Sequence, residues 1–343
     1  MSRPERRRPV ATEFYEGTFT LQWHITHRCN LRCTHCYQDD YSAFESREEL
    51  LDVLNQYEAM LRACRFKGAL NITGGEPLTH PDLFWLLEEA RRRDMTAAVL
   101  TNGTLIGKAE ALRLRHCGVS YVQVSLDGCE ETHDAIRGKG SFRSATEGIR
   151  RLLAQDIDTT VSFTAQRKNL RELPKLARYC RRLGVNKLWF DRVVIPSHED
   201  TEQLSLTPRD FDRLCRRAAR LNRSRSVSCA RALQFIPCRD KHIYRCTAGT
   251  RLLTVLADGT IMACRRLPLE LGNVHDSDLL TVYRSAPELL ALRQAKLPSD
   301  CEGCAYADAC AGGAKCIAYA RTGRCGAADP DCPLLRKKAR ISR

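Results

Sequence analysis

Apolar runs typical of strands alternate with longer amphipathic stretches over the first two-thirds of the chain. Such an alternation predicts β–α units and a parallel sheet. The predicted strands are residues 20–26, 69–73, 96–101, 121–125, 159–164 and 187–192. The predicted helices are residues 47–64, 81–93, 108–117, 142–155, 170–183 and 208–222. Six such units predict an α/β fold, either a barrel or, alternatively, a doubly wound open sheet.

Polar and glycine-rich segments follow the first four predicted strands. Residues 27–38 follow the first, residues 74–77 the second and residues 102–103 the third, and residues 125–128 end the fourth. Ligands bind at the carboxyl edge of the sheet in barrels and in open sheets alike. We therefore expect these four segments to form one binding site.

The pattern changes near residue 195, where a polar linker begins and regular periodicity is lost. The predicted organisation is an N-terminal extension (1–19), a barrel core (20–195), a linker with a bridging helix (196–228), a cysteine-rich domain (229–335) and a basic tail (336–343). In the cysteine-rich domain the cysteines are dense and the periodic segments are short, which favours a module held together by metal more than by a hydrophobic core.

The composition narrows the possible environments. The chain of 343 residues has 18 cysteines, yet it shows no secretory signal and no apolar run long enough to span a bilayer. We therefore expect a cytoplasmic protein without a membrane partner, in which clustered cysteines bind metal. The net charge of +14 suits an acidic peptide, although scattered basic residues also fit an ordinary solvated surface. The sequence has no compact patch of basic and aromatic residues, so we do not expect a nucleic-acid partner.

Three cysteines lie close together after the first predicted strand: Cys29, Cys33 and Cys36. Three thiolates leave one iron of a [4Fe–4S] cluster without a protein ligand, and that iron can bind a substrate. The alternative is a zinc site completed by His27 or His35.

The spacing Cys29-x3-Cys33-x-His35-Cys36, followed by Gly74-Gly75-Glu76-Pro77 after the second strand, resembles the radical SAM superfamily over residues 20–195. The combination disfavours the zinc alternative. The resemblance implies a partial (β/α)6 TIM-type barrel in which Cys29, Cys33 and Cys36 are the catalytic cluster ligands. It also implies that reductive cleavage of S-adenosylmethionine (SAM) gives a 5′-deoxyadenosyl radical, which abstracts hydrogen from a substrate.

The same resemblance assigns the contacts to SAM. The open iron would bind the methionyl amine and carboxylate, and the glycine-rich segment would accept hydrogen bonds from the ammonium group. The implied cofactor-binding residues are His35, Gly74, Gly75, Glu76, Pro77, Asn102, Ser125, Asp127 and Arg137. For Asn102, Asp127 and Arg137, a helix cap or an ordinary ion pair is the alternative.

The C-terminal cysteines resemble the SPASM extension, which holds one or two auxiliary [4Fe–4S] clusters. The distal cluster would use Cys301, Cys304, Cys310 and Cys332. The nearer one would use Cys246, Cys264 and Cys316, with Cys238 as a possible fourth ligand. Five residues instead of the usual three separate Cys310 from Cys316, which leaves the role of Cys316 open, and Cys325 is unassigned. A zinc ribbon over residues 301–316 is the alternative.

Enzymes of this architecture usually modify peptides, so the leading hypothesis is a maturase that forms a thioether or carbon-based crosslink in a ribosomally made precursor peptide. An electron donor such as flavodoxin or ferredoxin would be needed. The first strand begins near residue 20, which leaves no room for an N-terminal peptide-recognition domain, so we expect either a separate peptide-recognition protein or direct docking of the leader. The alternatives are formylglycine formation in a sulfatase, side-chain chemistry on a haem precursor, an iron–sulfur electron carrier and a zinc-binding protein.

Overall fold

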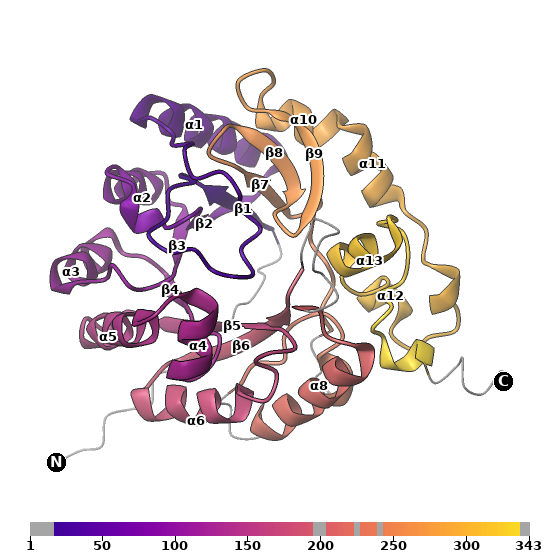
Figure 1. Ribbon diagram of the computed structural model, residues 1–343. Helices are drawn as coiled ribbons and strands as arrows, with labels where there is room; N and C mark the ends of the chain where they lie inside the picture. Colours follow the sequence, from indigo (N-terminus) through magenta and orange to yellow (C-terminus); the bar gives the residue numbers. More distant parts are fainter. Residues whose placement is uncertain (1–16, 195–203, 223–226, 239–242, 337–343) are drawn as a thin grey trace, which may run out of the picture.

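A computed structural model describes residues 17–194, 204–222, 227–238 and 243–336 (Figure 1). Its centre is a parallel sheet whose strands pair in the order β6-β5-β4-β3-β2-β1. The strands are β1 (Thr18–His24), β2 (Lys67–Thr73), β3 (Thr96–Thr101), β4 (Tyr121–Ser125), β5 (Thr159–Ala165) and β6 (Lys187–Arg192). Each strand pairs with its predecessor in the chain, which is the order of a barrel and not of a doubly wound sheet. The predicted partial barrel is confirmed.

Helices pack around the outside of the sheet, as Figure 1 shows. They are α1 (Arg47–Cys64), α2 (Leu83–Arg92), α3 (Lys108–Cys117), α4 (Glu130–Arg137), α5 (Ser141–Ala154), α6 (Leu173–Leu183) and α8 (Pro208–Asn222). Helix α1 begins where Ser46 and Glu49 cap each other reciprocally, a device that satisfies free backbone N–H groups. The sequence did not predict α4, because its eight residues are too few for a clear period.

Three further strands extend the sheet beyond β1. They are β7 (Leu252–Val255), β8 (Thr260–Cys264) and β9 (Leu267–Asn273). Strand β7 pairs parallel to β1, and the next two strands are antiparallel. The cysteine-rich part of the chain is therefore joined to the barrel by backbone hydrogen bonds, which the sequence analysis did not foresee.

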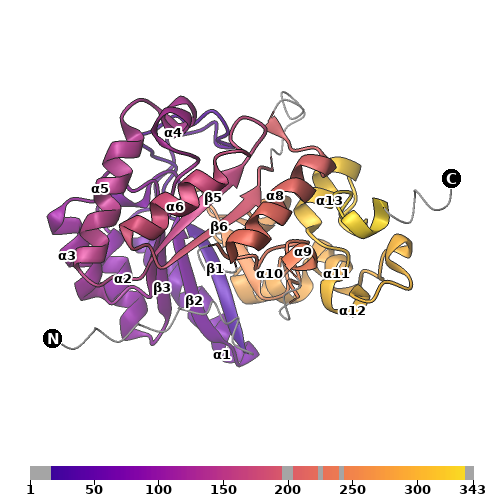
Figure 2. The same cartoon turned by 90° about the horizontal axis from the view of Figure 1, so that it is seen from below.

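The remaining helices are short and lie on the side of the barrel where β7–β9 extend the sheet, with α9 against α8 and α10 against α1 (Figures 1 and 2). They are α9 (Phe235–Cys238), α10 (Leu279–Ser285), α11 (Pro287–Gln294), α12 (Ala307–Cys310) and α13 (Lys315–Thr322). None of the helices among the described residues combines the length and hydropathy needed to cross a bilayer. The predicted domain boundaries stay a prediction, and residues 1–16 and 337–343 of the two predicted ends lie outside the described residues.

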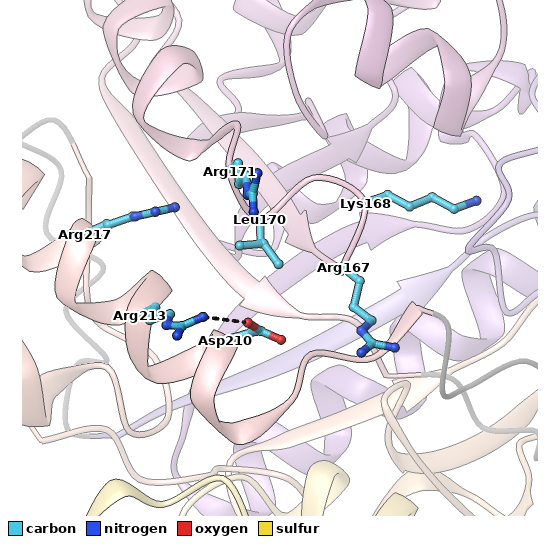
Figure 3. A pocket seen from close by; sticks show the side chains of 7 residues that line it. All are labelled: Arg167, Lys168, Leu170, Arg171, Asp210, Arg213 and Arg217. Atoms are coloured by element: carbon cyan, nitrogen blue, oxygen red, sulfur yellow. Dashed lines mark ion pairs between the residues drawn. The ribbon is translucent and has the colours of Figure 1, made fainter.

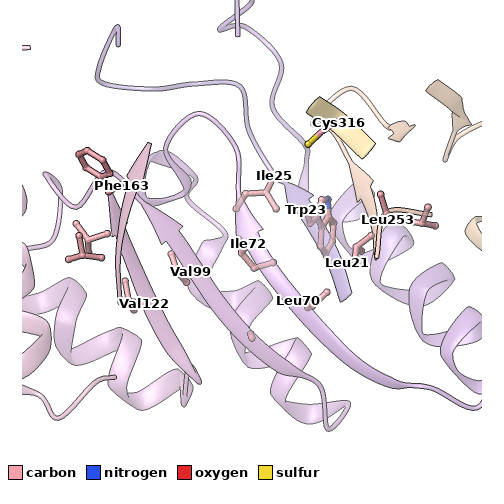
Figure 4. Packing of buried hydrophobic residues seen from close by; sticks show 14 of the residues in the cluster. Leu21, Trp23, Ile25, Leu70, Ile72, Val99, Val122, Phe163, Leu253 and Cys316 are labelled. Atoms are coloured by element: carbon pink, nitrogen blue, oxygen red, sulfur yellow. The ribbon is translucent and has the colours of Figure 1, made fainter. Parts of the chain in front are cut away.

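One hydrophobic cluster runs through both halves of the protein (Figure 4). In β1, Leu21 and Trp23 are fully buried, and the indole of Trp23 donates a hydrogen bond of 3.0 Å to the buried carboxyl group of Glu45. Leu253 and Cys316 of the cysteine-rich part belong to the same cluster. Each fully buried large apolar side chain contributes about 1.5–3 kcal/mol. The cysteine-rich part therefore has a hydrophobic core as well, contrary to the expectation of a module held mainly by metal.

A buried ion cluster fastens the end of the chain to the barrel. Arg192, the last residue of β6, donates hydrogen bonds of 2.9 and 2.7 Å to the two carboxylate oxygens of Asp329 and one of 2.7 Å to Asp331. All three side chains are at least 97% buried. Burial alone would lower the pKa of Arg192, but the two carboxylates more than offset it and hold that pKa well above its usual range.

Candidate functional site

The three-cysteine loop lies between β1 and α1, at the carboxyl edge of the sheet. The thiols of Cys29, Cys33 and Cys36 are all free, and Cys36 is exposed. Burial raises the pKa of Cys33 to about 11, Arg137 opposes the shift, and Cys36 and Cys29 add to it. The three sulfur atoms therefore lie within electrostatic reach of one another, as a shared cluster requires.

Two glycines allow the second segment to pack directly against this loop. A Cβ atom at Gly74 would lie 2.2 Å from the carbonyl oxygen of Thr26, and one at Gly75 would lie 2.3 Å from that of Arg28. Because glycine has no Cβ atom, the backbone of this segment can hydrogen-bond to that of the cysteine loop. Gly75 N donates to Thr26 O at 2.8 Å, and Glu76 N donates to Arg28 O at 2.8 Å. Only glycine permits this approach, so the pair fixes the path of the cysteine loop.

The carboxylate of Glu76 joins the same segment to the end of β3. It accepts hydrogen bonds of 2.7 Å from the Thr101 hydroxyl and 2.7 Å from the backbone N–H of Asn102. The side chain is fully buried, which raises its pKa to about 7 although these hydrogen bonds oppose the shift. Pro77 is buried beside it and begins a 3-10 helix, Pro77–Thr79. Glu76 thus holds two of the predicted site segments together.

Asn102 contacts the cysteine loop itself. Its Nδ2 donates a hydrogen bond of 2.9 Å to Oδ1 of Asn30, the residue after Cys29. Its own Oδ1 accepts hydrogen bonds from the backbone N–H and the hydroxyl of Thr104. The structure therefore gives Asn102 a role in positioning the loop.

Asp127 and Arg137 form a buried pair behind Cys33. Arg137 Nε donates a hydrogen bond of 2.6 Å to Asp127 Oδ2, and its Nη1 lies 3.8 Å from the Cys33 sulfur. The second carboxylate oxygen of Asp127 accepts from the backbone N–H of Thr164 at 2.8 Å. Burial alone would raise the pKa of Asp127, but Arg137 and His35 overcome it and lower that pKa. Arg137 therefore offsets negative charge on both Asp127 and a Cys33 thiolate.

His35 and Ser125 complete the predicted set. The Nε2 atom of His35 lies 3.6 Å from Asp127 Oδ2, while its buried Nδ1 has no hydrogen-bond partner in the described part of the chain. Burial lowers the pKa of His35 to about 4, so the ring is neutral near pH 7. Ser125 ends β4 opposite Ser162 of β5. The structure brings all the predicted SAM-binding segments to one edge.

One contact between the two cysteine-bearing parts of the chain has no signal in the sequence. The guanidinium group of Arg265, next to Cys264, stacks over the ring of Tyr37, next to Cys36, at 3.5 Å from the ring centroid. The Tyr37 side chain is 38% exposed. Burial nevertheless raises the pKa of its hydroxyl; Arg265 lowers that pKa, and Cys36 and Cys264 raise it further. Cys36 and Cys264 therefore both lie near this side chain.

The first C-terminal cysteine group gathers around Cys264. Burial raises the pKa of Cys316 to about 12, Arg266 opposes this, and Cys264 and Cys246 raise it further. Helix α13 begins at Lys315 and turns Cys316 inward, which brings it to the other two cysteines despite the unusual spacing. Cys325, which the sequence left unassigned, lies within electrostatic reach of Cys246. The side chain of Cys238 lies outside the described residues.

The second C-terminal group lines a small apolar pocket. The cysteines on its wall are Cys301, Cys304, Cys310 and Cys332, as the sequence grouped them. Burial raises the pKa of Cys310 to about 11, and Cys332 and Cys301 add to it.

Within the described ranges, no three His, Cys, Asp or Glu side chains converge on a point that could hold a single metal ion. Four zinc ligands would converge in this way, at about 2.3 Å per sulfur. The ligands of a [4Fe–4S] cluster bind separate irons and stand farther apart. The grouped free thiols, the glycine contacts and the unpaired Nδ1 of His35 fit a cluster and a polar cofactor.

Comparison with known proteins gives two family matches. Residues 23–180 match the Radical SAM superfamily, and residues 246–305 match the SPASM family, described as an iron-sulfur cluster-binding domain. The first runs from the end of β1 through β5 into α6 and stops before β6, and the second begins at Cys246 and ends just after Cys304.

Individual relatives extend these matches over most of the chain. The AdoMet-dependent heme synthase of Methanosarcina barkeri is 27% identical over 91% of this chain and 95% of its own length. The subtilosin biosynthesis protein AlbA of Bacillus subtilis is 30% identical over 82% of this chain and 62% of its own length. Two other curated relatives are matched over only 43% and 39% of their length.

A solved structure shares the fold. Native anSMEcpe with bound AdoMet and a Cp18Cys peptide superimposes with a TM-score of 0.75, at 20% identity, over 93% of this chain and 94% of that chain. Within such a fold, the cofactors are SAM, the [4Fe–4S] cluster that cleaves it, and auxiliary clusters in the C-terminal region. The chain is an enzyme that belongs to the radical SAM superfamily, with a C-terminal SPASM region.

Proposed function

We propose that this enzyme is a peptide maturase that forms a thioether or carbon-based crosslink in a ribosomally made precursor peptide. The observation that carries the proposal is the stacking of Arg265, the residue after Cys264, over the ring of Tyr37, the residue after Cys36. Cys36 and Cys264 both add to the raised pKa of Tyr37. A substrate side chain in this region would meet both the SAM site and the nearer auxiliary cysteines.

We assign roles to the chain's own residues accordingly. Cys29, Cys33 and Cys36 hold the cluster that, with SAM bound, supplies a radical able to abstract hydrogen from carbon. Arg137 balances the charge of Cys33 and keeps Asp127 ionised in a dry environment. The glycine-rich segment holds the backbone of the cysteine loop and would accept hydrogen bonds from the ammonium group of SAM.

The auxiliary sites follow the two groups seen in the structure. Cys246, Cys264 and Cys316 would hold the nearer cluster, and Cys325, within electrostatic reach of Cys246, would be its fourth ligand. Cys301, Cys304, Cys310 and Cys332 would hold the distal one. A flavodoxin or ferredoxin would supply electrons, a separate protein would assist peptide recognition, and the enzyme would act in the cytoplasm.

The similarity to AlbA supports a peptide substrate, because AlbA is a biosynthesis protein of the bacteriocin subtilosin and is matched over 82% of this chain. A second candidate is chemistry on a haem precursor. The specific observation in its favour is the match to the AdoMet-dependent heme synthase over nearly the full length of both chains.

Anaerobic turnover separates the two candidates. Reconstituted enzyme, SAM and reductant are incubated with candidate precursor peptides, taken from any short reading frames that neighbour the gene, and, separately, with an iron porphyrin precursor. Peptide maturation predicts that the peptide loses a pair of hydrogen atoms for each crosslink, as measured by mass spectrometry. A modified porphyrin and an unchanged peptide would contradict the proposal. Cys33→Ala is the control, because it must abolish either product.

A further inference from the structure

A pocket of about 410 Å³ lies outside the barrel, between the segment that follows β5 and helix α8 (Figure 3). The segment after β5 supplies one wall, and α8 supplies the other. The lining residues are Arg167, Lys168, Leu170, Arg171, Asp210, Arg213 and Arg217.

The pocket is strongly basic. Its lining has five cationic side chains and one carboxylate, Asp210, so the net formal charge is +4. Asp210 pairs with Arg213 at 3.8 Å, and no second carboxylate among the described lining residues faces Lys168, Arg171 and Arg217. Cations gathered in a concave surface repel one another and attract anions, and this effect decays over about 8–10 Å at physiological salt.

The wall formed by residues 166–172 has two chemically different sides. Asn169 is fully buried, and its Nδ2 donates hydrogen bonds of 3.0 Å to Asp127 O and 2.9 Å to Thr164 O. Arg167, Lys168 and Arg171 of the same segment are exposed on the pocket side (Figure 3). The basic pocket therefore backs directly onto the carboxyl edge of β4 and β5, where Asp127 lies.

We propose that this pocket docks an acidic segment of the peptide substrate, with several Asp or Glu carboxylates binding the arginines of both walls. The inference rests on the proposed function, since it requires a peptide. Guanidinium groups bind carboxylates through paired, charge-assisted hydrogen bonds, and a pocket of this size accepts more than one side chain. No aromatic side chain is among the described lining residues, so the stacking surface that single-stranded nucleic acids use is missing.

Binding to the reconstituted holoenzyme tests the proposal without turnover. The probe is a fluorescein-labelled peptide of about ten alternating Glu and Gly residues, measured by fluorescence anisotropy under anaerobic conditions. The matched control peptide has Gln in place of Glu. Arg171→Glu/Arg217→Glu reverses one cation on each wall and should weaken binding of the acidic peptide about 10- to 30-fold. Added salt should weaken it too.

A charge-matched variant separates the pocket from the general field of the protein. Lys108→Glu/Arg284→Glu reverses two exposed cations outside the pocket and should leave binding within about twofold of the wild type. Equal losses in the two double variants, an unchanged affinity in the pocket variant, or equal binding of the Gln peptide would overturn the proposal. So would free phosphate or a DNA oligonucleotide binding this pocket as tightly as the acidic peptide.

Failure of the docking site and failure of the proposed maturase function give different results. Cleavage of SAM without peptide, measured in parallel, should be unchanged in both double variants and shows that they are folded. Crosslinked product formed by a variant that no longer binds the acidic peptide would contradict only the docking site. Specific binding of the acidic peptide by an enzyme that modifies no peptide would contradict only the maturase function.

Discussion

Replacing Arg192 with Met is expected to weaken the attachment of the cysteine-rich part to the barrel. The side chain is 3% exposed and donates three hydrogen bonds of 2.7–2.9 Å to Asp329 and Asp331. Two opposite charges about 4 Å apart attract by about 4 kcal/mol at an effective dielectric constant of about 20. Without the cation, two buried carboxylates face each other, so the free energy of unfolding should fall by about 3–5 kcal/mol.

Urea denaturation of the reconstituted enzyme, followed by circular dichroism and by cluster absorbance, measures this loss. With a slope of about 3 kcal/mol per molar urea, the midpoint should fall by about 1–1.7 M. The triple variant Arg192→Met/Asp329→Asn/Asp331→Asn removes all three charges and should recover most of the loss. A midpoint for Arg192→Met within about 0.2 M of the wild type would show that this buried ion cluster does not stabilise the attachment.

Three further substitutions test separate parts of the site. Gly75→Ala places a Cβ atom 2.3 Å from Arg28 O and should lower SAM cleavage at least about tenfold. Gly326→Ala, which has open space around it, should leave SAM cleavage unchanged, and equal activities of the two variants would show that the close contact at Gly75 is not needed. Cys325→Ala should lower iron and sulfide content and alter the electron paramagnetic resonance signal of the nearer cluster; wild-type values would exclude it as a ligand. Tyr37→Leu should reduce product formed per SAM cleaved, while Tyr37→Phe keeps the ring that Arg265 covers, and identical ratios would remove its role.

The strands of the barrel could be read from the sequence because their signals are local. The predicted ranges 96–101, 121–125 and 187–192 agree with β3, β4 and β6. Their apolar runs are bounded by glycine-rich or polar segments, and each run is buried on a parallel sheet. The glycine and cysteine motifs were equally visible, because close backbone approach and thiol spacing depend on nearby residues.

Contacts between distant segments left no such signal. The pair of Arg192 and Asp329 spans 137 residues, and Tyr37 meets Arg265 only after β7 pairs with β1. Strand β7 has four residues, too few for an alternating pattern to stand out. The position of Cys316 depended on where helix α13 begins, which spacing alone does not give.

In the proposed active site, three thiolates hold a cluster whose fourth iron binds and cleaves SAM. This arrangement is tested by the 5′-deoxyadenosine that anaerobically reconstituted, reduced enzyme releases, compared between the wild type and Cys33→Ala. We expect steady release by the wild type and none by Cys33→Ala, while Cys304→Ala retains part of it. Release by Cys33→Ala at the wild-type rate, or a wild-type protein that binds zinc in this loop and leaves SAM intact, would show that the loop does not hold such a cluster.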